Sequence, residues 1–84
     1  MAFLKWSAEQ HGLDPKNPRG YHIDHLMPLA LLDPKDPAML AFANSPANVR
    51  WLSAWENARR GADLPTRKEL IAHRHHVRAW KKTL

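Results

Sequence analysis

The chain has 84 residues, enough for one small domain. It has no cysteine, which excludes disulfide bridges and zinc sites built from thiolates. No apolar run approaches the roughly 18 residues that a membrane span needs, and no signal peptide is recognisable at the start. We therefore expect a single domain over residues 1–84 that works in the cytoplasm and has no membrane partner.

The net charge of +5 is placed unevenly along the chain. Residues 1–65 hold seven basic and seven acidic side chains, whereas residues 66–84 hold six basic side chains against Glu69 alone. A neutral body with a basic arm predicts a polyanionic partner, most often nucleic acid, and the alternative is a solvated helix face. The side chains of this arm that we expect to contact nucleic acid are Arg74, Arg78, Lys81 and Lys82.

The predicted elements alternate between helical and extended patterns. In chain order they are a helix over residues 3–10, a strand over 21–25, a helix from 37 to about 43, a strand over 48–52, a helix from 54 to about 61 and a last helix of about 15 residues from 67. Asp36 is a typical N-cap, and capping boxes are predicted for Ser53 with Glu56 and for Thr66 with Glu69. These signals set the helix starts.

The first predicted strand ends in a carboxylate and an imidazole, Asp24 and His25. On a regular strand these two side chains point to opposite faces. They can serve one site only if the strand ends or bends there, which Pro28 favours. His22 shares the face of Asp24, and we expect it to be a half-buried packing residue, with a contact to phosphate or metal as the alternative.

Two carboxamides follow at a spacing of nine residues (57 − 48). Asn48 opens the second predicted strand, and Asn57 lies about one turn into the helix after it. Together with Asp24 and His25 they supply hard oxygen ligands, a base that titrates near neutrality and an amide that can fix geometry. Metal-assisted hydrolysis of a phosphodiester needs these groups.

These residues, in this order of strand, connection, strand and helix, resemble the HNH endonuclease family. The resemblance runs from about His22 to Asp63, half of the chain, and the spacing of the asparagines is similar to that in cysteine-free phage HNH proteins and in HNH domains of RNA-guided nucleases. It implies an α+β fold with a small ββα-metal core over about 21–63, made of a two-stranded antiparallel hairpin plus a helix. N- and C-terminal helices, the latter basic and spanning about 66–84, would flank this core.

The resemblance also implies a role for each motif residue. His25 would be the general base that takes a proton from the attacking water, and Asn48 would hold the loop that bears His25. Asp24 and Asn57 would bind one metal ion. Because Asn57 stands where the family often has histidine, the oxygen pair favours Mg²⁺ or Mn²⁺. Three arginines around the motif are further candidates for phosphate contacts, with ordinary exposed arginines as the alternative: Arg50, Arg59 and Arg60.

We therefore expect a metal-dependent DNA endonuclease. The alternative is a nucleic-acid-binding module that does not cleave, or that cleaves only when a larger effector complex or a fused recognition module activates it. A toxin-like nuclease acting on RNA is a third option. If the chain is encoded by a phage, the cytoplasm would be that of the host cell.

Five further aromatic side chains also have expected places. We predict that Trp51 and Trp55 belong to the core, with base-stacking platforms as the alternative. His73 is expected to pack on the apolar stripe of the last helix, and His75 and His76 to extend its basic face. The spacing of the histidines on that helix does not let their side chains converge on one point, so no metal site is predicted there.

Overall fold

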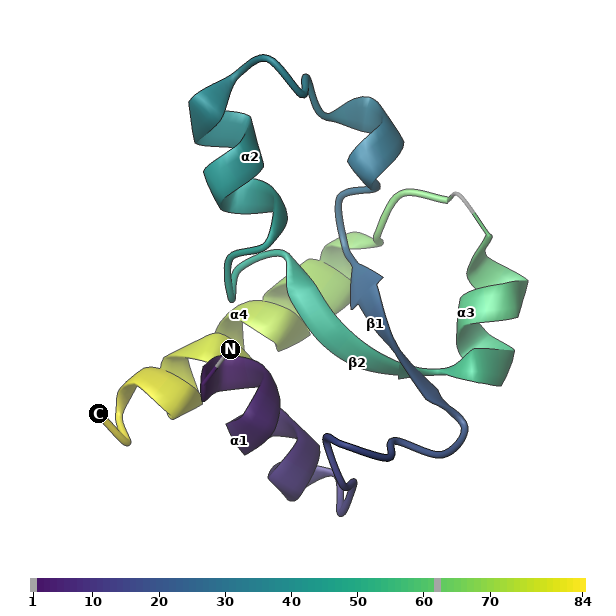
Figure 1. The fold of residues 1–84 in the computed structure, drawn as a ribbon, viewed down its shortest axis with the longest axis vertical. Coiled ribbons are helices and arrows are strands. Elements are labelled where there is room, and N and C mark those ends of the chain that lie inside the picture. The colour runs from purple at the N-terminus through teal and green to yellow at the C-terminus, as the bar shows by residue number, and fades with distance from the viewer. Residues whose placement is uncertain (1, 62) are drawn as a thin grey trace.

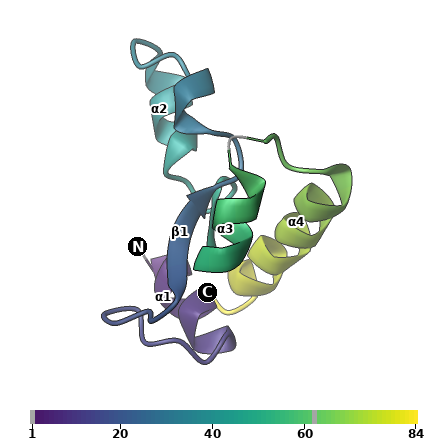
Figure 2. The same ribbon diagram turned by 90° about the vertical axis from the view of Figure 1, so that its right-hand side faces the viewer.

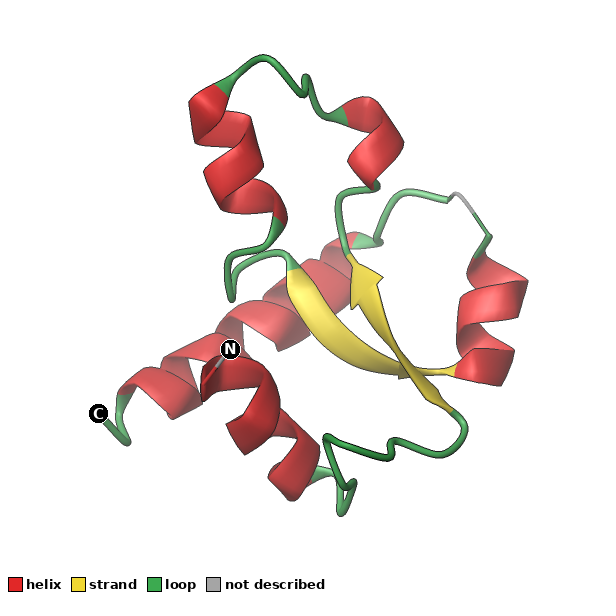
Figure 3. Cartoon of the chain, in the orientation of Figure 1, coloured by secondary structure: helices red, strands yellow, loops and turns green. Residues whose placement is uncertain are grey.

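The structure, a computed structural model, describes residues 2–61 and 63–84 and has an α+β architecture (Figures 1 and 3). In chain order its elements are α1 (Ala2–Gln10), β1 (Tyr21–His25), the 3₁₀ helix η1 (Leu29–Leu31), α2 (Pro37–Ala43), β2 (Val49–Ser53), α3 (Ala54–Arg60) and α4 (Arg67–Lys81). The predicted order of helices and strands is confirmed. The second strand begins one residue later than expected because the backbone N–H of Asn48 donates to Ser45 O in a turn (2.9 Å).

β1 and β2 form a two-stranded antiparallel sheet in which Asp24 pairs with Arg50 and His25 pairs with Val49. Side chains that stand opposite each other across such a pair share one face. Val49 and Trp51 therefore lie on one face, against which α1 packs, and the indole N–H of Trp51 donates to Leu4 O at 2.8 Å. Asp24 and Arg50 lie on the other face, toward α3.

β2 runs without a loop into α3, because Ser53 is both the last strand residue and the N-cap of the helix. The Ser53 hydroxyl accepts from Glu56 N at 3.1 Å, but the returning hydrogen bond of the expected box is not among those of the described residues. Gly61 ends the helix at φ +57°, a conformation that favours glycine. The direct junction fixes the direction of α3 relative to the strands and carries its last turn back toward β1.

The core lies between α1, β2 and α4, where Phe3, Val49 and Val77 are buried. The ring of Phe3 meets that of Trp80 edge to face at 5.4 Å. His73 is buried as expected, and its Nε2–H donates to Pro46 O at 2.7 Å. The capping box of Thr66 with Glu69 is complete, so α4 starts where the sequence predicted.

Three predictions about side-chain burial were wrong. Trp55 is 66% exposed, because its position in the first turn of α3 faces away from the sheet. His22 is exposed rather than half-buried. His76 does not extend the basic face but packs against Trp6, with ring centroids 4.8 Å apart, and bonds to the hydroxyl of Ser7 at 2.8 Å. Trp51 is buried, as predicted.

η1 and α2 form a lobe at one end of the sheet, while α1 lies at the other end (Figures 1 and 2). The radius of gyration is 12.9 Å, slightly above the value of about 12 Å expected for this length, which fits a projecting lobe. Large apolar side chains in the lobe are about half exposed, namely Leu29, Leu31, Met39, Leu40 and Phe42. No helix in the described part of the chain is long and apolar enough to cross a membrane.

Candidate functional site

Asp24 and His25 line one pocket, at the point where β1 ends and the chain turns toward η1. Pro28 and Leu29 form its wall on the lobe side, and the last turn of α3 closes it with Arg60 and Gly61. The end of the strand thus brings a carboxylate and an imidazole into one pocket, although on a regular strand they diverge. Both residues are partly exposed, although the side chain of Asp24 itself is only 10% exposed.

The imidazole of His25 is held by Asn44, whose Oδ1 lies 3.0 Å from Nε2. A carboxamide oxygen only accepts hydrogen bonds, so the ring donates from Nε2, and in the neutral imidazole this tautomer places the lone pair on Nδ1. Asn44 is the C-cap of α2, nineteen residues after His25, and no sequence pattern marked it as a site residue. Asn44 and His25 meet only because the lobe folds back on β1. The only local sequence signal at Asn44 was the predicted end of a helix.

The backbone that follows His25 is held by Asn48, which is 1% exposed. The side-chain Oδ1 of Asn48 accepts from Met27 N at 2.7 Å, and its Nδ2 donates to Met27 O at 3.2 Å and to Ala43 O at 3.1 Å. The backbone adds a fourth link, from Leu26 N to Asn48 O at 2.9 Å. The hydrogen bonds expected between Asn48 and this loop are therefore present, and they also tie the loop to the end of α2.

The carboxylate of Asp24 is paired with two guanidinium groups through the same oxygen, Oδ2. Arg50 donates from Nε at 2.9 Å and Arg60 donates from Nη1, while Arg50 also binds Glu69 at 2.7 Å. Burial alone would raise the pKa of Glu69, but the hydrogen bonds from Arg50 and Thr66 outweigh burial and lower it. The side chains of Asp24 and Arg60 are each only 10% exposed, so water screens this pair weakly.

Asn57 is half-buried on α3 and does not line the pocket of Asp24 and His25. Arg60, three residues later and hence on the same side of the helix, occupies that wall instead. The donor types still suit a hard divalent cation: Oδ1 of Asp24 and the carboxamide of Asn57 have no hydrogen-bond partner among the described residues. No group of three or more His, Cys, Asp or Glu in residues 2–61 and 63–84 is arranged to hold a metal.

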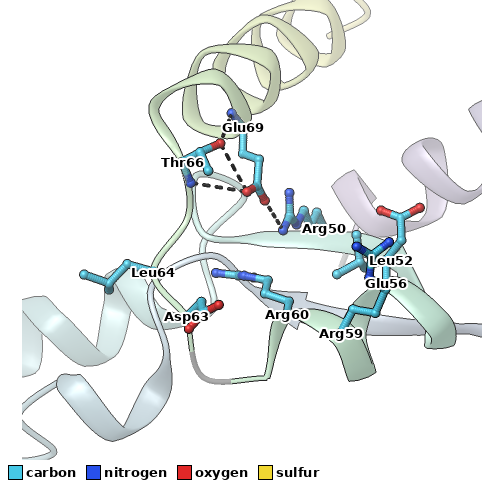
Figure 4. A pocket seen from close by; sticks show the side chains of 9 residues that line it. All are labelled: Arg50, Leu52, Glu56, Arg59, Arg60, Asp63, Leu64, Thr66 and Glu69. Carbon is cyan, nitrogen blue, oxygen red and sulfur yellow. Dashed lines mark hydrogen bonds and ion pairs between the residues drawn. The ribbon is translucent and has the colours of Figure 1, made fainter.

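A second pocket adjoins the first and lies between α3, β2 and the start of α4 (Figure 4). Arg50, Arg59 and Arg60 contribute to its lining, and the side chain of Arg60 extends into it from α3. Arg59 is exposed and its guanidinium lies 4.6 Å from the ring centroid of Trp55. Of the three arginines predicted near the motif, two are therefore engaged in ion pairs and one faces solvent.

The four predicted cationic contacts of the last helix are all exposed. Arg74, Arg78 and Lys81 line a shallow pocket beside Ala47 and the buried Val77. Residues spaced by four and three positions share one helix face, so these three cations form a stripe. Lys81 lies about 18 Å along the helix axis from Glu69, which contacts the arginine network of the candidate site.

We compared the chain with protein-family models, with curated proteins and with solved structures, and found no match in any of the three. The resemblance to the HNH family therefore stays a prediction.

Proposed function

We propose that this protein is a metal-dependent DNA endonuclease of the HNH type, with a ββα-metal core formed by β1, β2 and α3. The observation that carries the proposal is the double support of His25. Asn44 orients its ring at 3.0 Å, and Asn48 pins the backbone at Met27, two residues later. An ordinary surface histidine is not usually fixed by two carboxamide side chains. A general base must be held in place relative to its substrate, and this double support fits that role.

In this proposal, His25 accepts a proton from the attacking water at Nδ1. The water oxygen adds to phosphorus, the bond from phosphorus to the 3′ oxygen breaks, and solvent protonates the leaving oxygen. Asn44 keeps the other proton of the imidazole on Nε2, so that Nδ1 stays ready to accept. Such base catalysis contributes about 10²–10⁴-fold to the rate.

Asp24 would hold one Mg²⁺ or Mn²⁺ ion, because a carboxylate oxygen suits these cations. The carboxamide of Asn57 would be the second ligand, and since Asn57 does not line the pocket of the free protein, it would have to move toward Asp24. When bound, the ion would supply Lewis-acid stabilisation of the charge that develops on the phosphate and on the 3′ oxygen. Asp24 has Oδ1 available for this, since both arginines use Oδ2.

The cationic stripe of α4 would bind the DNA backbone on one side of the scissile bond. Its end, Lys81, lies about 18 Å along the helix axis from Glu69, a span of about five base pairs of B-form DNA. Backbone contacts of this kind are sequence-independent, so we expect little sequence preference from this chain alone. A fused recognition module or a larger effector would then supply any specificity.

The proposal is tested with purified protein and supercoiled plasmid, with Mg²⁺ or Mn²⁺ titrated against an EDTA control. Nicked or linear product that appears only with the divalent metal supports the proposal. Asp24→Asn is the matched variant, because Asp24→Ala would remove the carboxylate that Arg50 and Arg60 share and cost about 3–5 kcal/mol of stability. Retarded but intact plasmid under all metal conditions would contradict the proposal.

A second candidate function is a nucleic-acid-binding module that cleaves only when a partner activates it, or not at all. The observation that favours it is the double ion pair on Asp24, because two guanidinium groups compete with a cation for the same carboxylate. The plasmid assay separates the two candidates: this module would retard the plasmid with the same salt dependence but yield no nicked product.

A further inference from the structure

Arg60 is bound in an unusual way for an arginine at the end of a short helix. Its Nη1 donates to Asp24 Oδ2 and its Nη2 donates to Leu26 O at 2.7 Å, so it ties α3 to the end of β1. Its Nε is fully buried yet has no hydrogen-bond partner among the described residues. A buried donor without an acceptor is unfavourable, so this arrangement leaves the guanidinium only partly satisfied.

The same guanidinium stands between two adjoining pockets. One contains Asp24 and His25, and the other is lined by Arg50 and Arg59 and is shown in Figure 4. Arginine binds phosphate through two parallel N–H donors, and a phosphate oxygen could take up the donor that Nε leaves unused. A phosphate entering the second pocket would therefore compete with Asp24 for Arg60.

We propose that Arg60 blocks the metal site in the free protein and releases it when a nucleic-acid phosphate takes over its guanidinium. This inference rests on the proposed function, since it assumes that Asp24 binds the metal. While Arg60 stays on Asp24, a divalent cation meets a neutralised carboxylate and a nearby positive charge. Once a phosphate holds Arg60, only Arg50 still pairs with the carboxylate of Asp24, so the carboxylate attracts the cation more strongly.

Thermodynamic linkage gives this inference a measurable form. If the phosphate backbone raises metal affinity by some factor, the metal must raise nucleic-acid affinity by the same factor. Removing Arg60 should increase metal affinity in the absence of nucleic acid and abolish the coupling between the two ligands. A purely structural role for Arg60, as a tie between α3 and β1, predicts neither effect.

The first measurement is Mn²⁺ binding without nucleic acid, followed by the EPR signal of free Mn²⁺. We expect Arg60→Gln to lower the Kd for Mn²⁺ at least tenfold relative to the parent. Arg19→Gln, which removes an exposed arginine from the loop before β1, should leave the Kd unchanged, and Asp24→Asn should abolish tight binding. Should Arg60→Gln fail to fold by circular dichroism, Arg60→Lys replaces it and should shift the Kd less, in the same direction.

The second measurement is the affinity for a short DNA duplex with and without Mn²⁺, by fluorescence anisotropy, in a His25→Ala background that prevents cleavage. The metal should tighten DNA binding when Arg60 is present and have no such effect in the Arg60→Gln double variant. A folded Arg60 variant whose Kd for Mn²⁺ equals or exceeds that of the parent would overturn the inference alone. Absence of Mn²⁺ binding by the parent and by every Arg60 variant would instead overturn the metal-dependent function, and the inference with it.

Discussion

The carboxamide of Asn48 closes both backbone hydrogen bonds of Met27, accepting from its N–H at 2.7 Å and donating to its C=O at 3.2 Å. The side chain of Asn48 thus makes the pair of hydrogen bonds that a neighbouring strand would make to Met27, just after β1 ends. The third bond, to Ala43 O, joins the same carboxamide to α2. One buried side chain therefore sets the loop after His25 and the base of the lobe that carries Asn44.

We expect Asn48→Ala to destabilise the fold by about 2–4 kcal/mol, because each buried group that loses its partner costs about 1–3 kcal/mol. Urea denaturation followed by tryptophan fluorescence measures this change. Asn17→Ala is the control, since Asn17 is exposed in the loop before β1, and it should change stability by less than about 0.5 kcal/mol. Equal stabilities of the two variants would show that the Asn48 bonds contribute nothing.

Asn44 is predicted to be a positioning residue for His25. Asn44→Ala should lower kcat by up to about tenfold, the equivalent of one hydrogen bond, with little change in KM or in metal affinity. Asn44→Asp should move the acidic limb of the pH–rate profile to higher pH, because a carboxylate next to the ring favours its protonated form. An acidic limb that stays at the parental pH in Asn44→Asp would show that Asn44 does not act through His25.

The packing of α1 against α4 predicts a loss of stability in mild acid. Burial lowers the pKa of His73 and of His76 below 6.5, and His11 and His73 lower that of His76 further. The unfolded chain therefore binds more protons, so the free energy of unfolding should fall as the pH drops from about 7.5 through 6.5. The contribution of Glu69, whose pKa is lowered from 4.5, is retained over this range and lost only at more acidic pH.

Thermal unfolding at a series of pH values measures this dependence. His76→Gln should flatten the slope between pH 7.5 and 5.5, whereas His75→Gln, an exposed neighbour on the same helix, should leave it unchanged. Stability that is constant or rises over this interval would contradict the proposed packing of the imidazoles.

The cationic end of α4 is expected to bind phosphate groups. Replacing Lys81 and Lys82 with glutamine should weaken binding about equally for all DNA sequences. It should also reduce the slope of log K against log salt by about one unit for each phosphate that the variant no longer neutralises. The matched control replaces Lys16 and Lys35, which are also exposed but lie in loops away from α4. If both double variants lower the slope equally, the effect comes from net charge and α4 makes no specific backbone interaction.

The positions of the helices could be predicted because their start signals are local. Asp36 accepts from Ala38 N at 2.9 Å, and Thr66 and Glu69 form both bonds of their box. Such signals involve residues within four positions of one another, so the sequence displays them directly. The strand of residues 21–25 was predicted with its observed bounds from simple alternation.

The contacts that join distant segments could not be predicted in this way. The pairing of Asp24 with Arg60 spans 36 residues and depends on the direct junction of β2 and α3 at Ser53. Asn44 reaches His25 only because the lobe folds back on β1. The direction of α3 decides that Trp55 is exposed. The prediction that Trp55 lies in the core used only the hydrophobicity of the residue and was therefore wrong.

Single-turnover cleavage of plasmid DNA by His25→Ala in saturating Mg²⁺ tests the central claim most directly. We predict a loss of about 10²–10⁴-fold relative to the parent, with partial recovery when imidazole is added as an external base. His22→Ala, which removes an exposed imidazole from the same strand, should cleave at the parental rate. A folded His25→Ala protein that cleaves as fast as the parent would contradict the assignment of His25 as the general base.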